Sequence, residues 1–200
     1  RPSPATLAVL ARAPSMTALP DSQMTAGTSQ RQRNRIAGVC ERDIDLLLLE
    51  EFQSSPSLLT WFLEAGGEGA ASPTLVDARR AVTQASGESD LDIEWADGTG
   101  ERHRLLIENK VGAGFQPRQA TRYHERASAY RDRGEVASVV LVLVAPARYL
   151  GAGVKDHGFD SFVSYEAIRG WFIGREDLGA RRLYKAELLE SAIEKGVLGY

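Results

Sequence analysis

The chain has 200 residues, of which 43% are hydrophobic and 26% are charged, and its formal net charge at pH 7 is -3. Length and composition are typical of a globular protein with one domain-sized core. The only cysteine, Cys40, excludes an internal disulfide framework and any cysteine-rich zinc site, and we expect it to be a small buried residue. The acidic balance confines any nucleic-acid-binding surface to a local basic patch.

The N-terminal part of the sequence differs from the rest. Residues 1–35 are rich in proline, serine, threonine, alanine, glutamine and arginine, which predicts a disordered segment ahead of a domain at residues 36–200. Met16 and Met24 are both possible translation starts. The longest apolar run, residues 139–145, is too short to cross a membrane, so we expect a cytoplasmic protein without membrane contact.

Two helices are predicted at the start of the domain. The first begins at Glu41, where apolar residues start to recur at helical spacing. The second follows Ser55 and Pro56, which suit the N-cap and the first helical position, and ends at Gly66–Gly67.

Three strands are expected next. Residues 75–83 form a plausible first strand, and residues 90–95 alternate between acidic and apolar side chains with a period of two. Asp97–Gly98 predicts a turn, after which residues 104–111 return as the next strand.

The remaining elements alternate between helix and strand. A helix is predicted at residues 117–131, a strand buried on both faces at 136–145, a short strand at 159–163, and helices at 165–172 and 181–195. This order predicts an α/β fold whose mixed sheet, an antiparallel meander plus a parallel buried strand, is flanked by helices.

The predicted hairpin carries the side chains that could bind a metal or take part in catalysis. Asp90, Asp92 and Glu94 share one face of their strand, and Glu108 and Lys110 share one face of the next. A turn near residues 98–100 pairs residues whose numbers sum to about 198, which places Asp90 opposite Glu108. A slip of two residues would place Asp92 there instead.

Two neighbouring carboxylates repel each other unless a hard cation such as Mg²⁺ bridges them. Lys110 beside such a cation could orient or deprotonate an attacking water, or stabilise charge developing on a phosphate. The alternative reading of Asp90, Glu108 and Lys110 is a salt-bridge ladder on an exposed sheet face.

The residues around this hairpin resemble those of a known enzyme family. Gly87-Glu88-Ser89-Asp90, the 18-residue step to Glu108-Asn109-Lys110, and Gln119 followed four residues later by Tyr123 resemble the PD-(D/E)xK nuclease superfamily, in particular its bacterial and phage branch. The resemblance covers residues 41–171, and Ser89 stands where the motif of the family has proline.

The resemblance implies a restriction-endonuclease-like core and Mg²⁺- or Mn²⁺-dependent hydrolysis of phosphodiester bonds, with DNA as the expected substrate. It implies that Asp90 and Glu108 bind the metal and that Lys110 is the catalytic lysine. Gln119 and Tyr123 would position the metal-bound water or the nucleic-acid backbone.

The resemblance also implies a metal-binding glutamate on the first helix. Glu41 is our choice and Glu51 is the alternative, although both residues also suit a solvated helix face.

A basic stripe follows on the predicted helix at residues 117–131. Arg118, Arg122 and Arg126 recur at intervals of four and are candidate nucleic-acid-binding residues. The alternative is a solvated face balanced by Glu125. No His-x-x-x-His spacing occurs, which argues against a zinc site.

Two other functions remain open. One is a catalytically inactive module of the nuclease fold that binds nucleic acid or regulates a partner. The other is a hydrolase that uses Asp90 and Glu108 as an acid/base pair on a substrate such as a glycoside.

Overall fold

The computed structural model describes residues 36, 38–69, 71–84, 87–112, 114, 116, 118–151 and 158–198. The predicted disordered segment, residues 1–35, lies outside the described residues. None of the helices in the described ranges combines the length and the apolarity that a membrane crossing requires.

A five-stranded sheet with the order β1-β2-β3-β4-β5 organises the described residues. Its strands are β1 (Thr74–Gln84), β2 (Gly87–Ala96), β3 (Arg102–Asn109), β4 (Ser138–Ala145) and β5 (Ser161–Ser164). The first three strands pair antiparallel, whereas β4 and β5 join in parallel. The predicted α/β fold with a mixed sheet is therefore confirmed.

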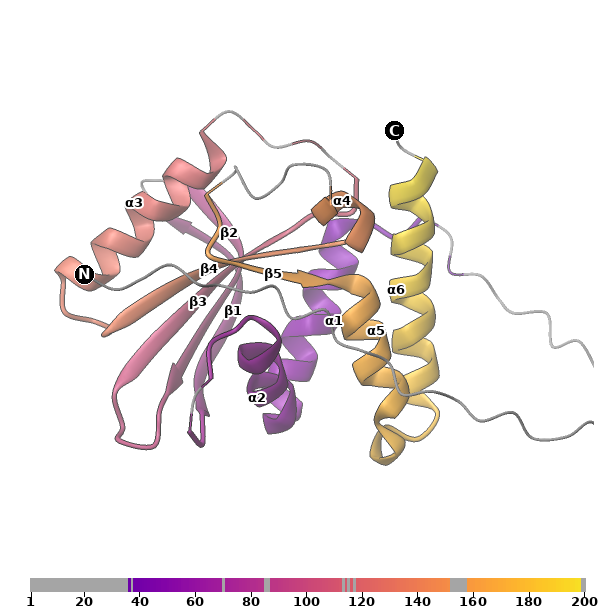
Figure 1. The fold of residues 1–200 in the computed structure, drawn as a ribbon, viewed down its shortest axis with the longest axis horizontal. Helices are drawn as coiled ribbons and strands as arrows, with labels where there is room; N and C mark the ends of the chain where they lie inside the picture. The colour runs from indigo at the N-terminus through magenta and orange to yellow at the C-terminus, as the bar shows by residue number, and fades with distance from the viewer. Residues whose placement is uncertain are drawn as a thin grey trace, which may run out of the picture. The chain divides into compact units, whose positions relative to one another are not determined.

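Helices cover both faces of this sheet (Figure 1). Helix α3 (Gln119–Asp132) packs on one face. The other face carries α1 (Glu41–Ser54), α2 (Pro56–Ala65), α5 (Tyr165–Gly174) and α6 (Arg181–Leu198). Two short elements that the sequence did not predict complete the fold, α4 (Ala147–Gly151) and the 3-10 helix η2 (Glu176–Leu178).

The interior strand β4 contacts both helical layers. Val142 and Val144 pack in the core beneath α1 and α5, whereas Leu141 and Leu143 pack in the core beneath α3. All four side chains are almost fully buried. A parallel strand with helices on both faces buries every second side chain on each side, which explains its continuous apolar sequence.

The pairing of β2 with β3 sets the position of the acidic residues. Leu91 lies opposite Ile107, so the residue numbers of each pair sum to 198, as predicted. Asp90 and Glu108 lie one residue beyond this last pair, next to each other across the two strands. Strand β3 ends at Asn109 rather than at residue 111, although the Lys110 N–H still donates to the Val144 carbonyl at 2.8 Å.

Asp92, the alternative to Asp90, belongs to a different cluster. The Arg104 guanidinium donates to Asp92 Oδ2 at 3.1 Å and also to Glu94. The Tyr130 hydroxyl of α3 donates to the same Asp92 oxygen at 2.8 Å. Asp92 is thus neutralised beneath α3, away from Glu108.

The expectation that Cys40 is buried is wrong. Cys40 is exposed and occupies the N-cap of α1, where its N–H donates to Asp43 Oδ2 at 2.9 Å. The chain enters the helix at the surface, and the capping residue remains accessible to solvent.

The first prediction concerns the ion pairs that Arg104 forms with Asp92 and Glu94. Replacing Arg104 with alanine leaves the buried Asp92 carboxylate without its cation and Glu94 with only the half-exposed Arg102, so Arg104→Ala should lower the free energy of unfolding by roughly 3–5 kcal/mol. Urea denaturation measures this loss. Arg102, which is half-exposed and also pairs with Glu94, provides the control: Arg102→Ala should cost less than about 1 kcal/mol. Equal losses in both variants would contradict the assigned role of Arg104.

Candidate active site

The carboxyl end of β3 brings three of the predicted site residues together. Lys110 Nζ lies 2.7 Å from Glu108 Oε1. Asp90 Oδ2, on the adjacent strand β2, accepts a hydrogen bond from the Asn109 N–H at 2.8 Å. Glu108 is 3% exposed and Lys110 is 6% exposed, so the pair is buried. This burial excludes the alternative reading of an exposed salt-bridge ladder for these two residues.

Helix α3 supplies two further donors to the same carboxylate. Gln119 Nε2 donates to Glu108 Oε1 at 2.5 Å, and the Tyr123 hydroxyl donates to Glu108 Oε2 at 2.7 Å. The two donors lie one helical turn apart on one face of α3. Burial, together with the negative charges of Glu108 and Asp90, raises the pKa of Tyr123 well above 10, so its hydroxyl remains protonated.

Burial and the nearby charges change the pKa values of Asp90 and Lys110. Burial and the neighbouring Glu108 charge raise the pKa of Asp90 from 3.8 to about 7, and Asp45 adds to this effect. Burial alone would lower the pKa of Lys110, but the Glu108 carboxylate and other nearby acids outweigh it and raise that pKa above 10.5. Lys110 is therefore an ammonium group at neutral pH beside the ionised Glu108.

The two glutamates considered on α1 lie in different places. Glu41 Oε1 accepts a hydrogen bond from the Val111 N–H at 3.1 Å, directly after Lys110. Glu51 is fully buried further along the helix and forms an ion pair with Lys185 of α6. Of the two, only Glu41 lies at the end of β3.

Asn109 joins this site to the helices on the opposite face of the sheet. Its Nδ2 donates to the Glu41 carbonyl at 2.9 Å and to Asp45 Oδ1 at 2.8 Å. Its Oδ1 accepts from the Tyr165 hydroxyl of α5. Burial raises the pKa of Asp45 to about 6, against the opposing effect of the Asn109 hydrogen bond. Asp45 is thus a further carboxylate at the site.

The sequence interpretation missed Asp45 and Tyr165 and assigned no role to Asn109. A signal existed for Asp45, because it lies four residues after Glu41 and directly follows Ile44 on the buried side of an apolar helix. Tyr165 had no such signal, since 56 residues separate it from Asn109 in the sequence.

The three candidate nucleic-acid-binding arginines do not form one exposed stripe. The Arg118 side chain is 74% exposed and pairs with Glu125 at 3.3 Å. Arg122 is half-buried and donates to Gln116 Oε1 at 3.2 Å. Arg126 is 1% exposed, so from its place in the structure it cannot contact a nucleic acid on the surface.

Arg126 instead packs inside the protein beside the site. Its guanidinium lies 4.3 Å from the centre of the Tyr123 ring, and its Nη1 donates to Ser89 Oγ at 3.0 Å. It therefore contacts the tyrosine that holds Glu108 and the residue that precedes Asp90. The regular spacing of the arginines misled the sequence interpretation, because the face of α3 turns from solvent toward the sheet along its length.

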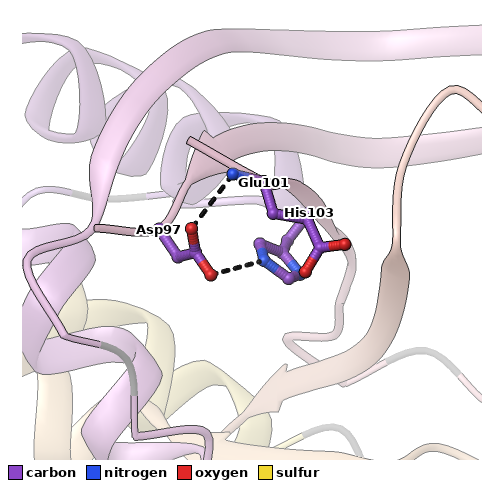
Figure 2. Close-up of side chains that lie close together, drawn as sticks. All are labelled: Asp97, Glu101 and His103. Atoms are coloured by element: carbon purple, nitrogen blue, oxygen red, sulfur yellow. Dashed lines mark hydrogen bonds and ion pairs between the residues drawn. The ribbon is translucent and has the colours of Figure 1, made fainter. Parts of the chain in front are cut away.

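A second group of metal-ligating residues lies at the β2–β3 turn, which Figure 2 shows in close-up. One ligand atom from each of Asp97, Glu101 and His103 lies within 4.8 Å of the others. His103 Nε2 is 3.5 Å from Asp97 Oδ2, and His103 Nδ1 is 2.9 Å from Ser138 Oγ. Asp97 Oδ1 accepts from the Thr99 and Glu101 N–H groups at 2.8 and 3.0 Å. The sequence analysis did not single out this group.

The two acidic groups differ as sites for a cation. Within the described residues, only the turn group brings three such ligand atoms within 4.8 Å of one another. Asp97 already caps the turn, however, and Glu101 is exposed. At the end of β3, Asp90 and Glu108 offer buried carboxylate oxygens whose mutual repulsion a divalent cation would relieve. This donor chemistry fits Mg²⁺ or Mn²⁺.

Comparisons with known proteins do not decide between these sites. No protein-family model, no curated protein and no solved structure matches the chain. The function of the chain must therefore be inferred from its own residues and their geometry.

The raised pKa of Asp90 predicts a stability that depends on pH. Because the folded-state pKa lies near 7 and the ordinary value is 3.8, the ionised carboxylate destabilises the fold as the pH rises through this window. Asp90→Asn should therefore unfold at higher temperature than the parent above pH 7, and the difference should vanish below about pH 4. The expected gain is on the order of 2–4 kcal/mol, since each pKa unit corresponds to about 1.36 kcal/mol.

Asp97 provides a control of opposite sign. Hydrogen bonds, first from the Thr99 hydroxyl, lower the pKa of Asp97 to about 2, so its ionised form stabilises the fold above pH 3.8. Asp97→Asn should be less stable than the parent at pH 7, and the difference should close as the pH falls from 4 to 2. Calorimetry of both variants over this range measures the two effects. A stability difference for Asp90→Asn that does not change with pH would contradict the burial argument.

Proposed function

We propose that this chain is a metal-dependent nuclease of the PD-(D/E)xK type that hydrolyses phosphodiester bonds, with DNA as the first substrate to test. The observation that carries the proposal is the environment of Glu108: Lys110, Gln119 and Tyr123 all donate to its carboxylate. These residues belong to the motif on which the resemblance rests. The mixed sheet with helices on both faces is compatible with a restriction-endonuclease-like core.

Asp90 and Glu108 are the residues that would hold Mg²⁺ or Mn²⁺, with Glu41 as the third candidate ligand. When bound, such a cation supplies a Lewis acid for the phosphate and lowers the pKa of the attacking water. Asp45 lies close enough to raise the pKa of Asp90 and increases the negative potential that attracts the cation.

In this proposal Lys110 stabilises the negative charge that develops during the reaction. It is an ammonium group beside Glu108, so it can donate hydrogen bonds to the nucleophile or to a phosphate oxygen as negative charge develops. Gln119 and Tyr123 act as positioning residues, because their hydrogen bonds fix both oxygens of the Glu108 carboxylate.

The contact with nucleic acid falls to the exposed Arg118 and the half-buried Arg122 near the site. Arg118 precedes Gln119 directly, and Arg122 lies one turn further along α3. The net charge of -3 means that such local groups must attract the phosphate backbone.

A second candidate function is a catalytically inactive module of the same fold that binds nucleic acid or regulates a partner. The observation that favours it is that both Glu108 oxygens are already held by the protein, since each accepts a hydrogen bond from one of its side chains. A site arranged in this way can stabilise the fold without turning over a substrate.

Lys110→Ala tests the proposal. It removes one of the three donors to Glu108 but leaves Gln119 and Tyr123, so the fold should persist. We expect cleavage of single- or double-stranded DNA in Mg²⁺ to fall by about a thousandfold, because a transition-state donor is lost. Lys195→Ala, which removes a lysine that donates to the Val39 carbonyl, is the matched control and should cleave normally. Parallel reactions with RNA in place of DNA, and with EDTA in place of Mg²⁺, test the substrate and the dependence on metal.

Metal titration separates the outcomes. Glu108→Gln should abolish Mn²⁺ binding, whereas His103→Ala should not affect the cation that supports cleavage. Undiminished cleavage by Lys110→Ala would overturn the assigned chemistry. Binding of nucleic acid without metal binding or cleavage would favour the inactive module. Loss of Mn²⁺ binding only in His103→Ala would place the cation at the β2–β3 turn.

A further inference from the structure

Arg80, on the edge strand β1, has an unusual environment for an arginine. Its side chain is 28% exposed, and its one ion pair in the described part of the chain is with Asp45 Oδ2 at 3.7 Å. Its Nε is buried and has no hydrogen-bond partner. An arginine with five donors and one long ion pair retains most of its capacity to bind an anion.

The position of Arg80 connects it to the candidate active site. Arg80 pairs in register with Leu91, the residue that follows Asp90. Its partner Asp45 also accepts from Asn109 Nδ2 at 2.8 Å, and Asn109 follows Glu108. The guanidinium therefore lies beside Asp45 on the α1 side of the sheet. Asp45 is the α1-side member of the acidic cluster that it forms with Asp90 and Glu108 at the end of β3, whereas the Glu108 side chain faces α3.

Two other buried cations, Arg104 and Lys110, are already paired with carboxylates. Arg104 is held between Asp92 and Glu94 beneath α3. Lys110 has a side chain that is 8% exposed and rests on Glu108. Among these cations, Arg80 is the most exposed and has the weakest partner.

A nucleic acid that approaches the acidic cluster needs a positively charged group of the protein to offset the repulsion between its phosphates and the carboxylates. Asp90, Glu108 and Asp45 all repel phosphate, and the positive charge of Lys110 is partly offset by its contact with Glu108. A guanidinium fork matches two phosphate oxygens, and exchange of a 3.7 Å ion pair for such a contact costs little.

We propose that Arg80 binds a backbone phosphate of the nucleic-acid substrate beside the acidic cluster. This inference rests on the proposed function and deepens it, since it assigns a substrate-binding residue from β1 that the sequence motif does not include.

Arg79 provides a matched control. It is the preceding residue on the same strand, its side chain is 65% exposed, and it forms an ion pair with Asp77. Strand alternation directs its side chain to the opposite face from that of Arg80. Arg79→Ala and Arg80→Ala therefore each remove one positive charge from β1, and they differ only in the face of the strand from which the charge is lost.

The experiment measures binding of a fluorescent DNA oligonucleotide to Lys110→Ala, alone and combined with Arg80→Ala, Arg80→Lys or Arg79→Ala. Arg80→Ala should weaken binding about tenfold. It should also reduce the slope of log K against log salt by about 0.7–0.9, because one phosphate contact is lost. Arg80→Lys should bind with intermediate affinity, since it keeps the charge without the fork. Arg79→Ala should match the parent.

Cleavage kinetics with Lys110 intact provide the second readout. Arg80→Ala should raise KM with little change in kcat, because the contact serves binding rather than the chemical step. Arg80→Gln, which retains polar side-chain volume next to Asp45, keeps the test valid where Arg80→Ala lowers stability.

The outcomes separate this inference from the proposed function. Equal binding by the Arg80→Ala and Arg79→Ala variants, or weaker binding with an unchanged salt slope, would overturn the role of Arg80 alone. DNA binding that depends on Arg80 in a protein that never cleaves would leave the role intact and overturn the nuclease proposal. Binding of inorganic phosphate through Arg80, without any DNA binding, would overturn both.

Discussion

The carboxylate of Glu108 is buried at the end of β3, and Lys110, Gln119 and Tyr123 all donate to it. A carboxylate in such a place can remain ionised only when it is paired and hydrogen-bonded. One donor comes from the same strand segment and two come from the first turns of α3, so α3 must begin directly over the end of β3. The crossover from β3 to β4 and the candidate chemistry therefore depend on the same hydrogen bonds.

The next residue, Asn109, ties the opposite helical layer to the same point. Successive side chains of a strand face opposite sides of the sheet, so Asn109 meets Asp45 of α1 and Tyr165 of α5 where Glu108 meets α3. Acidic groups from both layers consequently gather at one strand end, and their burial and repulsion raise the pKa of Asp90 to about 7 and that of Asp45 to about 6. Such destabilised groups are common at functional sites, where a bound cation or substrate relieves the repulsion.

Much of the local structure could be predicted from the sequence. The period of two in β2 and the position of the turn predicted a pairing sum of 198, and the structure has that register at Leu91 and Ile107. The same reasoning failed where a property depends on a distant partner. Arg126 repeats the spacing of Arg118 and Arg122, but side chains four residues apart turn by about 40° around a helix at each step, so Arg126 reaches the buried side of α3 and packs on Tyr123.

The sequence by itself determined the order of the elements, the mixed sheet and the placement of acidic side chains of β2 on the same face as Glu108, because these follow from local periodicity and short-range pairing. Only the tertiary structure decided which of two similar carboxylates lies there. Arg104 and Tyr130 hold Asp92 beneath α3, and Lys185 of α6 holds Glu51, whereas Asp90 and Glu41 remain next to the strand end. The hairpin register places Arg104 opposite Glu94, but the Tyr130 hydroxyl that completes the Asp92 cluster comes from α3. Lys185 likewise reaches Glu51 only through the packing of α6 on α1, which no local pattern encodes.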